Sequence, residues 1–142
     1  MSWALTLVPV PVSDVDRART FYTEQVGFRL DHDTRLDGTM RLIQLTPPGS
    51  GCSIAIGTDL VDSEPGSLTG LLLVVPDLDR ARAELVARGV EVSEIERVGP
   101  EDGAAFLRFS DPDGNGWAIQ EIRGAARTSE VEQLGAQSEL AS

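Results

Sequence analysis

Cysteine and histidine are almost absent from this chain of 142 residues, which has one of each, Cys52 and His32. A single cysteine excludes an intramolecular disulfide and a thiolate-rich zinc site. A single histidine gives no support from sequence alone for a Ser-His-Asp triad. Cys52 lies in a strand-like stretch of alternating polarity, so we expect it to be a small buried residue rather than a nucleophile.

Basic residues are scarce as well. The chain has 12 Lys and Arg against 23 Asp and Glu, a formal net charge of −11, and no basic run. Phosphate-rich partners require clustered positive charge, so the composition argues against binding to nucleic acid or to an anionic membrane surface. The acidic residues are scattered along the chain, as is typical of a solubilising surface.

The sequence also lacks a cationic, apolar start and any apolar run long enough to span a membrane. We therefore expect a cytoplasmic protein. Apolar residues make up 41% of the chain and charged residues 25%, an ordinary balance for one globular domain of this length.

The chain does contain an internal repeat. Residues 12–19 read V-S-D-V-D-R-A-R and residues 75–82 read V-P-D-L-D-R-A-R, with six of eight positions identical. A second pair follows in the same order, G-S-G-C-S-I at 49–54 and G-N-G-W-A-I at 114–119. Two matched segments in one order indicate a duplicated structural unit.

Each copy has the pattern of a β-α-β-β-β unit. Asp14 and Asp77 are suited to cap the two helices, and Gly27 and Gly89 to end them. In the first copy we expect strands at 3–9, 28–34, 40–46 and 52–57 around a helix at 14–26. In the second we expect strands at 70–75, 90–95, 105–109 and 117–122 around a helix at 77–88.

These elements predict a single α+β domain over residues 1–123. It consists of repeat one at 3–57, a linker at 58–69 that carries Pro65 and Gly66, and repeat two at 70–123. Residues 124–142 are small and polar, and we expect a frayed helix or a disordered tail there.

The two V-x-D-x-D-R-A copies, together with F-S-D-P-D-G-N-G-W before the last strand, resemble the vicinal oxygen chelate superfamily. This group includes glyoxalase I, bleomycin-resistance proteins and extradiol dioxygenases, and the resemblance covers about residues 4–122. It implies two β-α-β-β-β repeats packed as paired half-barrels around a pocket, with the helices outside. A fold of this kind hosts many functions.

The resemblance also places the usual metal ligands, which are His, Gln or Glu in metal-dependent members. The equivalent positions here are Leu7, Gly70, Ala118 and either Ser53 or Ala55. The aliphatic side chains and glycine offer no lone pair, and a serine hydroxyl is a poor ligand for transition metals. We therefore expect no metal site and no cofactor.

Polar residues that interrupt apolar strands are candidates for ligand binding. Gln44 and Arg108 occupy near-equivalent positions in the two repeats, and Gln120 shares a strand face with Ala118. The alternative is that these three side chains simply face solvent. By the two-residue strand period, we expect a pocket between the two sheets lined by Leu7, Leu42, Gln44, Leu72, Ala118 and Gln120, with Arg108 at its mouth.

His32 is a weaker candidate. A metal at His32 would need Asp31 or Asp33 as a partner, but adjacent strand residues point to opposite faces. A surface histidine, or one satisfied at a strand edge, is the simpler interpretation.

Three functions remain open. The first is a metal-independent protein that binds a hydrophobic or aromatic small molecule, as bleomycin-resistance proteins do. The second is an enzyme, such as a lyase, isomerase or dioxygenase, that uses non-standard groups or a metal on Gln44, Gln120, Glu121 or His32. The third is a structural or regulatory protein with a vestigial pocket. In each case the resemblance implies a homodimer, in which residues 3–5 and the strand of Trp117 would cover strand edges.

Overall fold

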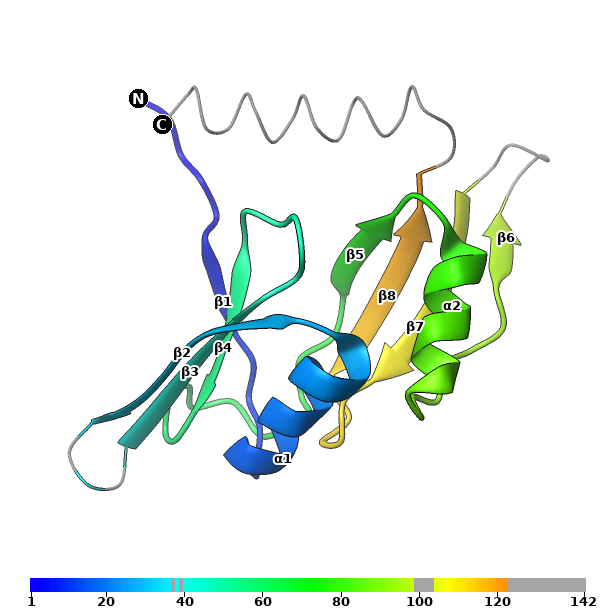
Figure 1. Ribbon diagram of the computed structural model, residues 1–142. Coiled ribbons are helices and arrows are strands. Elements are labelled where there is room, and N and C mark those ends of the chain that lie inside the picture. Colours follow the sequence, from blue (N-terminus) through cyan, green and yellow to red (C-terminus); the bar gives the residue numbers. More distant parts are fainter. Residues whose placement is uncertain (37, 39, 99–103, 123–142) are drawn as a thin grey trace.

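The computed structural model describes residues 1–36, 38, 40–98 and 104–122. Over these residues the chain forms two four-stranded sheets with helices beside them, which confirms the α+β class (Figure 1). The first sheet contains β1 (Leu7–Pro9), β2 (Arg29–Leu36), β3 (Met40–Thr46) and β4 (Ser53–Gly57). The second contains β5 (Leu71–Val75), β6 (Glu96–Val98), β7 (Ala104–Ser110) and β8 (Gly116–Glu121).

Both sheets have the same topology. Their strand orders are β1-β4-β3-β2 and β5-β8-β7-β6. In each, the first strand pairs in parallel with the last strand of its repeat, and the other pairs are antiparallel. The duplication in the sequence is therefore a duplication of the sheet. Residues 124–142, where we expect a polar tail, lie outside the described residues.

The helices α1 (Val15–Thr20) and α2 (Leu78–Ala87) start as the repeated motif predicts. The carboxylate of Asp14 accepts a hydrogen bond of 3.0 Å from the backbone N–H of Arg17, and Asp77 accepts one of 3.0 Å from that of Arg80. Both caps satisfy a backbone donor of the first helical turn that has no partner within the helix.

The first helix does not continue as an α-helix to residue 26. Phe21–Val26 form the π-helix η1, which ends at Gly27 with a φ of 96°. The backbone N–H of Gly27 donates to the carbonyl oxygen of Tyr22, five residues earlier. This wider turn accompanies the burial of the adjacent side chains of Phe21 and Tyr22, whose rings meet edge to face.

The expected strand at 90–95 is wrong, because the strand of this repeat is β6 at Glu96–Val98. Val92 forms an isolated bridge with Phe109. Next to it, the hydroxyl of Ser93 accepts a hydrogen bond from the backbone N–H of Arg108, and Arg82 donates to the carbonyl oxygen of Ser93. The Ser93 hydroxyl and the Arg82 guanidinium thus bond to backbone groups that strand pairing would otherwise satisfy, and the ladder is interrupted here.

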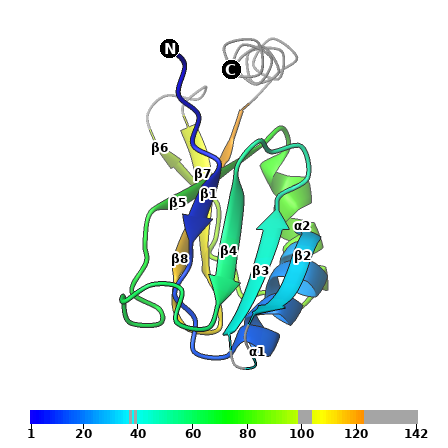
Figure 2. The ribbon, with the colours of Figure 1, turned by 90° about the vertical axis from the view of Figure 1, so that its left-hand side faces the viewer.

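Both sheets bury one face on the side of the helices. The two helices lie on the same side of the molecule, to the right in Figure 2. In the described residues, one hydrophobic cluster includes strand residues of both repeats together with Phe21, Tyr22, Leu78 and Leu85 of the helices. Phe21 approaches Phe109 of the second sheet, with ring centroids 6.3 Å apart. The π-helix η1 therefore joins the two repeats through a shared core.

Candidate functional site

The outer face of each sheet is the face turned away from the helices, and it carries the residues that the sequence suggested for ligand binding. On β3, Ile43 and Leu45 are fully buried on the helix side, whereas Leu42 and Gln44 are half-buried on the outer face. The strands β5 and β8 alternate in the same way. The candidate residues on the outer faces are Leu7, Leu42 and Gln44 in the first sheet, and Leu72, Arg108, Ala118 and Gln120 in the second.

On the first sheet, the candidates lie next to two small residues of the central strand β4. Leu7 is the ladder neighbour of Ser53, and Gln44 is the ladder neighbour of Ala55. Ser53 and Ala55 are buried because they are small and have a strand on either side. Position 53 therefore offers a hydroxyl oxygen at the floor of this face, and position 55 offers no donor or acceptor from its side chain.

A series of hydrogen-bonded side chains crosses this face; we call Gln44, Ser53, Thr46 and Asp31 the polar chain. The Gln44 Nε2 group donates to Ser53 Oγ over 3.4 Å, and Ser53 Oγ lies 2.6 Å from Thr46 Oγ1. Thr46 Oγ1 donates to the carboxylate of Asp31, which also accepts a 2.9 Å bond from Arg29. These hydrogen bonds, first that from Thr46, hold the pKa of the Asp31 carboxyl below its usual range.

A β-bulge places Asp31 in this chain. Leu30 pairs with Leu45 and His32 pairs with Gln44, so Asp31 is the extra residue between two regular pairs. Strict alternation would have put Asp31 and His32 on opposite faces, and that expectation is wrong here. The described residues contain no group of three His, Cys, Asp or Glu side chains able to hold a metal ion.

The outer face of the second sheet is more apolar. Leu72 is 57% exposed and Val74 is 46% exposed, and they are the ladder neighbours of Ala118 and Gln120. Sequence reasoning missed Phe106, the other ladder neighbour of Gln120. Two-residue counting from Arg108 would have found it, since both lie on the same face of β7.

Phe106 and Arg108 form a cation–π pair. The guanidinium carbon of Arg108 lies 4.9 Å from the centroid of the Phe106 ring. Arg108 also makes a 3.5 Å ion pair with Glu96 on the neighbouring strand. The pair gives this face a flat aromatic surface next to a positive charge.

Ladder register changes one of the positions inferred from the resemblance. Counting back from Val75 selects Gly70, but Gly70 precedes β5 and has a φ of 86°. The residue beside Ala118 is Leu72, just as Leu7 is beside Ser53. Three of these four residues in register, Leu7, Leu72 and Ala118, have aliphatic side chains, and the fourth is a serine.

The candidates of the two sheets form two separate groups. The ladders join members of each group to one another but belong to two different sheets. A cavity of about 310 Å³ lies on the helix side, between the end of η1 and α2, where Phe28, Pro47, Leu85 and Arg88 contribute to its walls. A hollow of about 480 Å³ includes Arg108. Neither the cavity nor the hollow is lined by candidate residues of both sheets.

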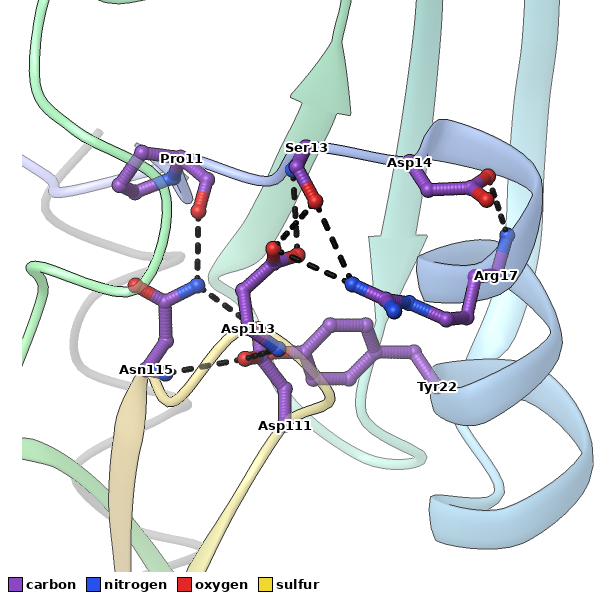
Figure 3. A network of polar contacts seen from close by, with 8 residues as sticks. All are labelled: Pro11, Ser13, Asp14, Arg17, Tyr22, Asp111, Asp113 and Asn115. Carbon is purple, nitrogen blue, oxygen red and sulfur yellow. Dashed lines mark hydrogen bonds and ion pairs between the residues drawn. The ribbon is translucent and has the colours of Figure 1, made fainter.

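The D-P-D-G-N turn before β8 joins the two repeats through buried polar contacts (Figure 3). The Asn115 side chain is fully buried, and its Nδ2 group donates to the carbonyl oxygen of Pro11 and to Asp111, each over 2.8 Å. Asp111 also accepts a 2.7 Å bond from the hydroxyl of Tyr22, which accepts one of 2.9 Å from Trp117. We call these five residues the inter-repeat network.

Each acidic residue of the turn has a structural partner in this region. Burial, followed by the nearby Asp111 carboxylate, raises the pKa of the Tyr22 hydroxyl, so this group stays protonated and donates. Asp113 accepts hydrogen bonds from the backbone and hydroxyl of Ser13 and an ion pair from Arg17. Asp111 and Asp113 thus hold the repeats together.

The linker takes part in the same junction. The backbone N–H of Leu68 donates to Asn115 Oδ1 over 3.0 Å, and Gly66 donates to the carbonyl oxygen of Pro11 over 3.2 Å. A Cβ at Gly66 would lie 2.0 Å from the carbonyl oxygen of Asp113, and its φ is 84°. Only glycine fits such a close approach at positive φ.

Comparison with known proteins gives a consistent family. The family model described as Glyoxalase/Bleomycin resistance protein/Dioxygenase superfamily matches residues 4–119. A search of curated proteins returned no match. In the described residues, no helix has the length and apolar character needed to cross a membrane.

Several solved structures are similar. TnmS3, an antibiotic binding protein from Streptomyces sp. CB03234, is 38% identical with a TM-score of 0.71, covering 84% of this chain and 95% of that chain. A glyoxalase/bleomycin resistance protein from the same organism is 37% identical with a TM-score of 0.72, covering 83% and 100%. A superfamily member from Sphaerobacter thermophilus DSM 20745 is 32% identical with a TM-score of 0.73, covering 84% and 98%.

Proposed function

Because the chain belongs to the Glyoxalase/Bleomycin resistance protein/Dioxygenase superfamily, we propose that it binds a hydrophobic or aromatic small molecule without metal and without turnover. The observation that carries this proposal is the composition of the outer faces. Exposed Leu72 and Val74 and the Phe106 ring lie beside a few oriented polar groups, Gln120 and Arg108 among them. Sites for small molecules typically combine apolar walls with a few placed polar groups.

The similarity to TnmS3 supports the same proposal. That protein is described as an antibiotic binding protein, and it is 38% identical over most of both chains. Binding and sequestration require a shaped surface and no reacting group. Leu7, Leu72, Ala118 and Ser53, at the positions in register, provide such a surface and lack the imidazole or carboxylate that a metal-dependent reaction uses.

We further propose that the site is completed in a homodimer. Each outer face in a single chain is open, and Trp3 and Leu5, before β1, are 87% and 73% exposed. Exposed apolar groups of this size commonly mark an interface. Light scattering at micromolar concentration should give a mass near twice the 15.2 kDa of one chain. A mass of one chain would contradict this part of the proposal.

The test of function is a calorimetric titration with 2-hydroxyanthraquinone as the probe. We expect saturable, stoichiometric binding, and we expect the compound to be recovered unchanged after incubation with added Fe, Mn, Zn or Ni. Consumption of the compound would favour an enzyme of the superfamily. Absence of binding by this probe and by a wider panel of flat aromatic compounds would favour a vestigial pocket.

A pair of matched variants locates the binding surface. Leu72→Glu puts a charge on the outer face of β5 and should abolish binding, because the charge would have to be desolvated under the ligand. Val86→Glu changes a residue of similar exposure on α2, 50% against 57%, and should leave binding unchanged. Equal affinities in the two variants would place the site elsewhere.

A further inference from the structure

The polar chain of the first sheet has a definite direction of hydrogen bonding. Asp31 lies at one end, and as a carboxylate it only accepts hydrogen bonds. Thr46 donates its hydroxyl proton to Asp31. The hydroxyl of Ser53, 2.6 Å from Thr46 Oγ1, must then supply the proton shared by these two oxygens. Ser53 has no second hydroxyl proton, so it accepts from Gln44, whose Nε2 group lies 3.4 Å away.

The reversed orientation of the Gln44 amide would break this order. With Oε1 turned to Ser53, the single hydroxyl proton of Ser53 would have to serve both Gln44 and Thr46, because the Thr46 proton is already given to Asp31. Either the 3.4 Å contact with Gln44 or the 2.6 Å contact with Thr46 would then join two oxygen atoms with no proton between them. The Gln44 oxygen would also turn toward the side of the negatively charged Asp31.

We propose that the polar chain fixes Gln44 with its Oε1 carbonyl turned outward, so that the first sheet selects aromatic ligands carrying a hydrogen-bond donor, such as a phenolic hydroxyl or an N–H group. This inference rests on the proposed small-molecule binding at the outer faces. Gln44 is half-buried, and its carbonyl has one fixed role, because rotating the amide would cost the proton order of three side chains. A methyl ether or a carboxylate at the same place has no proton to donate, so it would face the Gln44 carbonyl oxygen without a hydrogen bond.

The orientation of Gln44 is testable without any ligand. In an NMR spectrum of the full chain, the side-chain amide protons of Gln44 should show nuclear Overhauser effects to the β protons of Ser53. These signals should be weaker in Thr46→Val, which removes the hydroxyl that fixes the direction of the Ser53 proton and so lets the amide occupy both orientations. Their absence in the parent protein would overturn the inference.

Selectivity is measured with two matched probes, 2-hydroxyanthraquinone and 2-methoxyanthraquinone, by calorimetry. The parent protein should bind the hydroxyl compound about 3- to 10-fold more tightly, the range expected for one neutral hydrogen bond. Thr46→Val, which leaves Gln44 itself unchanged, should reduce this preference to within about twofold, since the amide is then free to rotate. Affinity for the methoxy compound should change little.

Two further variants keep the result interpretable. Thr34→Val makes the same substitution on the same outer face but outside the polar chain, and it should preserve the preference. If thermal melting shows that Thr46→Val is not folded, Ser53→Ala breaks the chain one step closer to Gln44 and should have the same effect on selectivity.

The donor selectivity at Gln44 and the small-molecule binding at the outer faces can fail separately, and the experiments distinguish the two outcomes. Equal binding of both probes by the parent protein would overturn the donor selectivity while leaving small-molecule binding intact. Binding of neither probe, nor of the wider panel, would overturn the proposed function, and with it the role of Gln44 in selecting ligands. The same loss of preference in Thr34→Val would assign the effect to the surface in general and overturn the role of the polar chain.

Discussion

The outer faces of the two sheets share a backbone plan and differ in chemistry. On the first sheet, Gln44, Ser53 and Thr46 are linked by hydrogen bonds that end at a carboxylate. On the second, Phe106 and Arg108 form a stacked pair among exposed aliphatic side chains. The duplication thus preserved strand order and helix caps, whereas the outer faces diverged. The small-molecule binding that we propose would therefore involve two chemically unlike surfaces.

The two repeats also differ in how they treat the turn before their last strand. Asn115 in the second repeat is fully buried and contacts Pro11 of the first repeat. At the corresponding place in the first repeat, Ser50 is exposed and bonds locally to the backbone of Cys52. One turn therefore stabilises the whole domain, and its counterpart stabilises only itself.

The largest expected effect comes from removing the buried Asn115 side chain, which distinguishes the second turn from the first. Asn115→Ala should lower the free energy of unfolding by about 2–4 kcal/mol, because it removes three side-chain hydrogen bonds and leaves the backbone N–H of Leu68 without an acceptor, while Pro11 and Asp111 keep their other donors. Denaturant unfolding measures the change. The matched variant Ser50→Ala should cost less than about 0.5 kcal/mol. Comparable losses in the two variants would refute a special role for the second turn.

A smaller effect is expected from the aromatic surface of the second sheet. Phe106→Ala should weaken binding of 2-hydroxyanthraquinone by about 0.5–1.5 kcal/mol, since it removes the ring on which a flat ligand can stack. Calorimetry with the parent protein as reference measures this loss. Phe106→Tyr keeps the ring and should keep most of the affinity. If Phe106→Ala binds as well as the parent protein, the ligand does not stack on the second sheet.

The smallest effect concerns the pH dependence of the first sheet. The pKa of Asp31 is lowered in the folded state, so the folded protein binds this proton less readily than the unfolded chain does. The stabilisation that the Asp31 carboxylate provides is therefore complete above its ordinary pKa of 3.8, and it is lost as the pH falls through the lower pKa of the folded state. The melting temperature of the parent protein should exceed that of Asp31→Asn at pH 7, and the gap should narrow below pH 3.8.

A control on the second sheet sharpens this comparison. Glu96→Gln changes a carboxylate that pairs with Arg108 at 3.5 Å on an exposed part of the sheet. Exposed pairs contribute little to stability, so its melting temperature should stay close to that of the parent protein at pH 7. A constant gap between parent and Asp31→Asn down to pH 2 would show that the Asp31 charge does not stabilise the fold.

Local signals in the sequence predicted the fold well. The repeated V-x-D-x-D-R-A-R motif located both helices, because Asp14 and Asp77 cap them through contacts only three residues away. Period-two alternation identified the outer face, because Ile43 and Ile119 are buried on the opposite side. These features depend on residues that are close in sequence, where pattern and propensity are informative.

The features that sequence reasoning missed depend on distant partners. The bulge at Asp31 is stabilised by Thr46 on the next strand, and the break at Ser93 depends on Arg108. The orientation of Gln44 follows from a proton order spread over three strands. Contacts between residues this far apart leave no periodic trace in a single sequence. Whether the outer faces bind a ligand stays a prediction.

The bond between Asn115 and Pro11 spans 104 residues and therefore constrains the order in which the protein folds on the ribosome. The first repeat emerges before Asp111 and Trp117 have been synthesised, so Tyr22 has no partner for its hydroxyl and its ring is only partly covered. Closing so long a loop is slow, and an incomplete core exposes apolar surface in the meantime. The first repeat therefore completes its core only after the second repeat, as far as Trp117, has been synthesised.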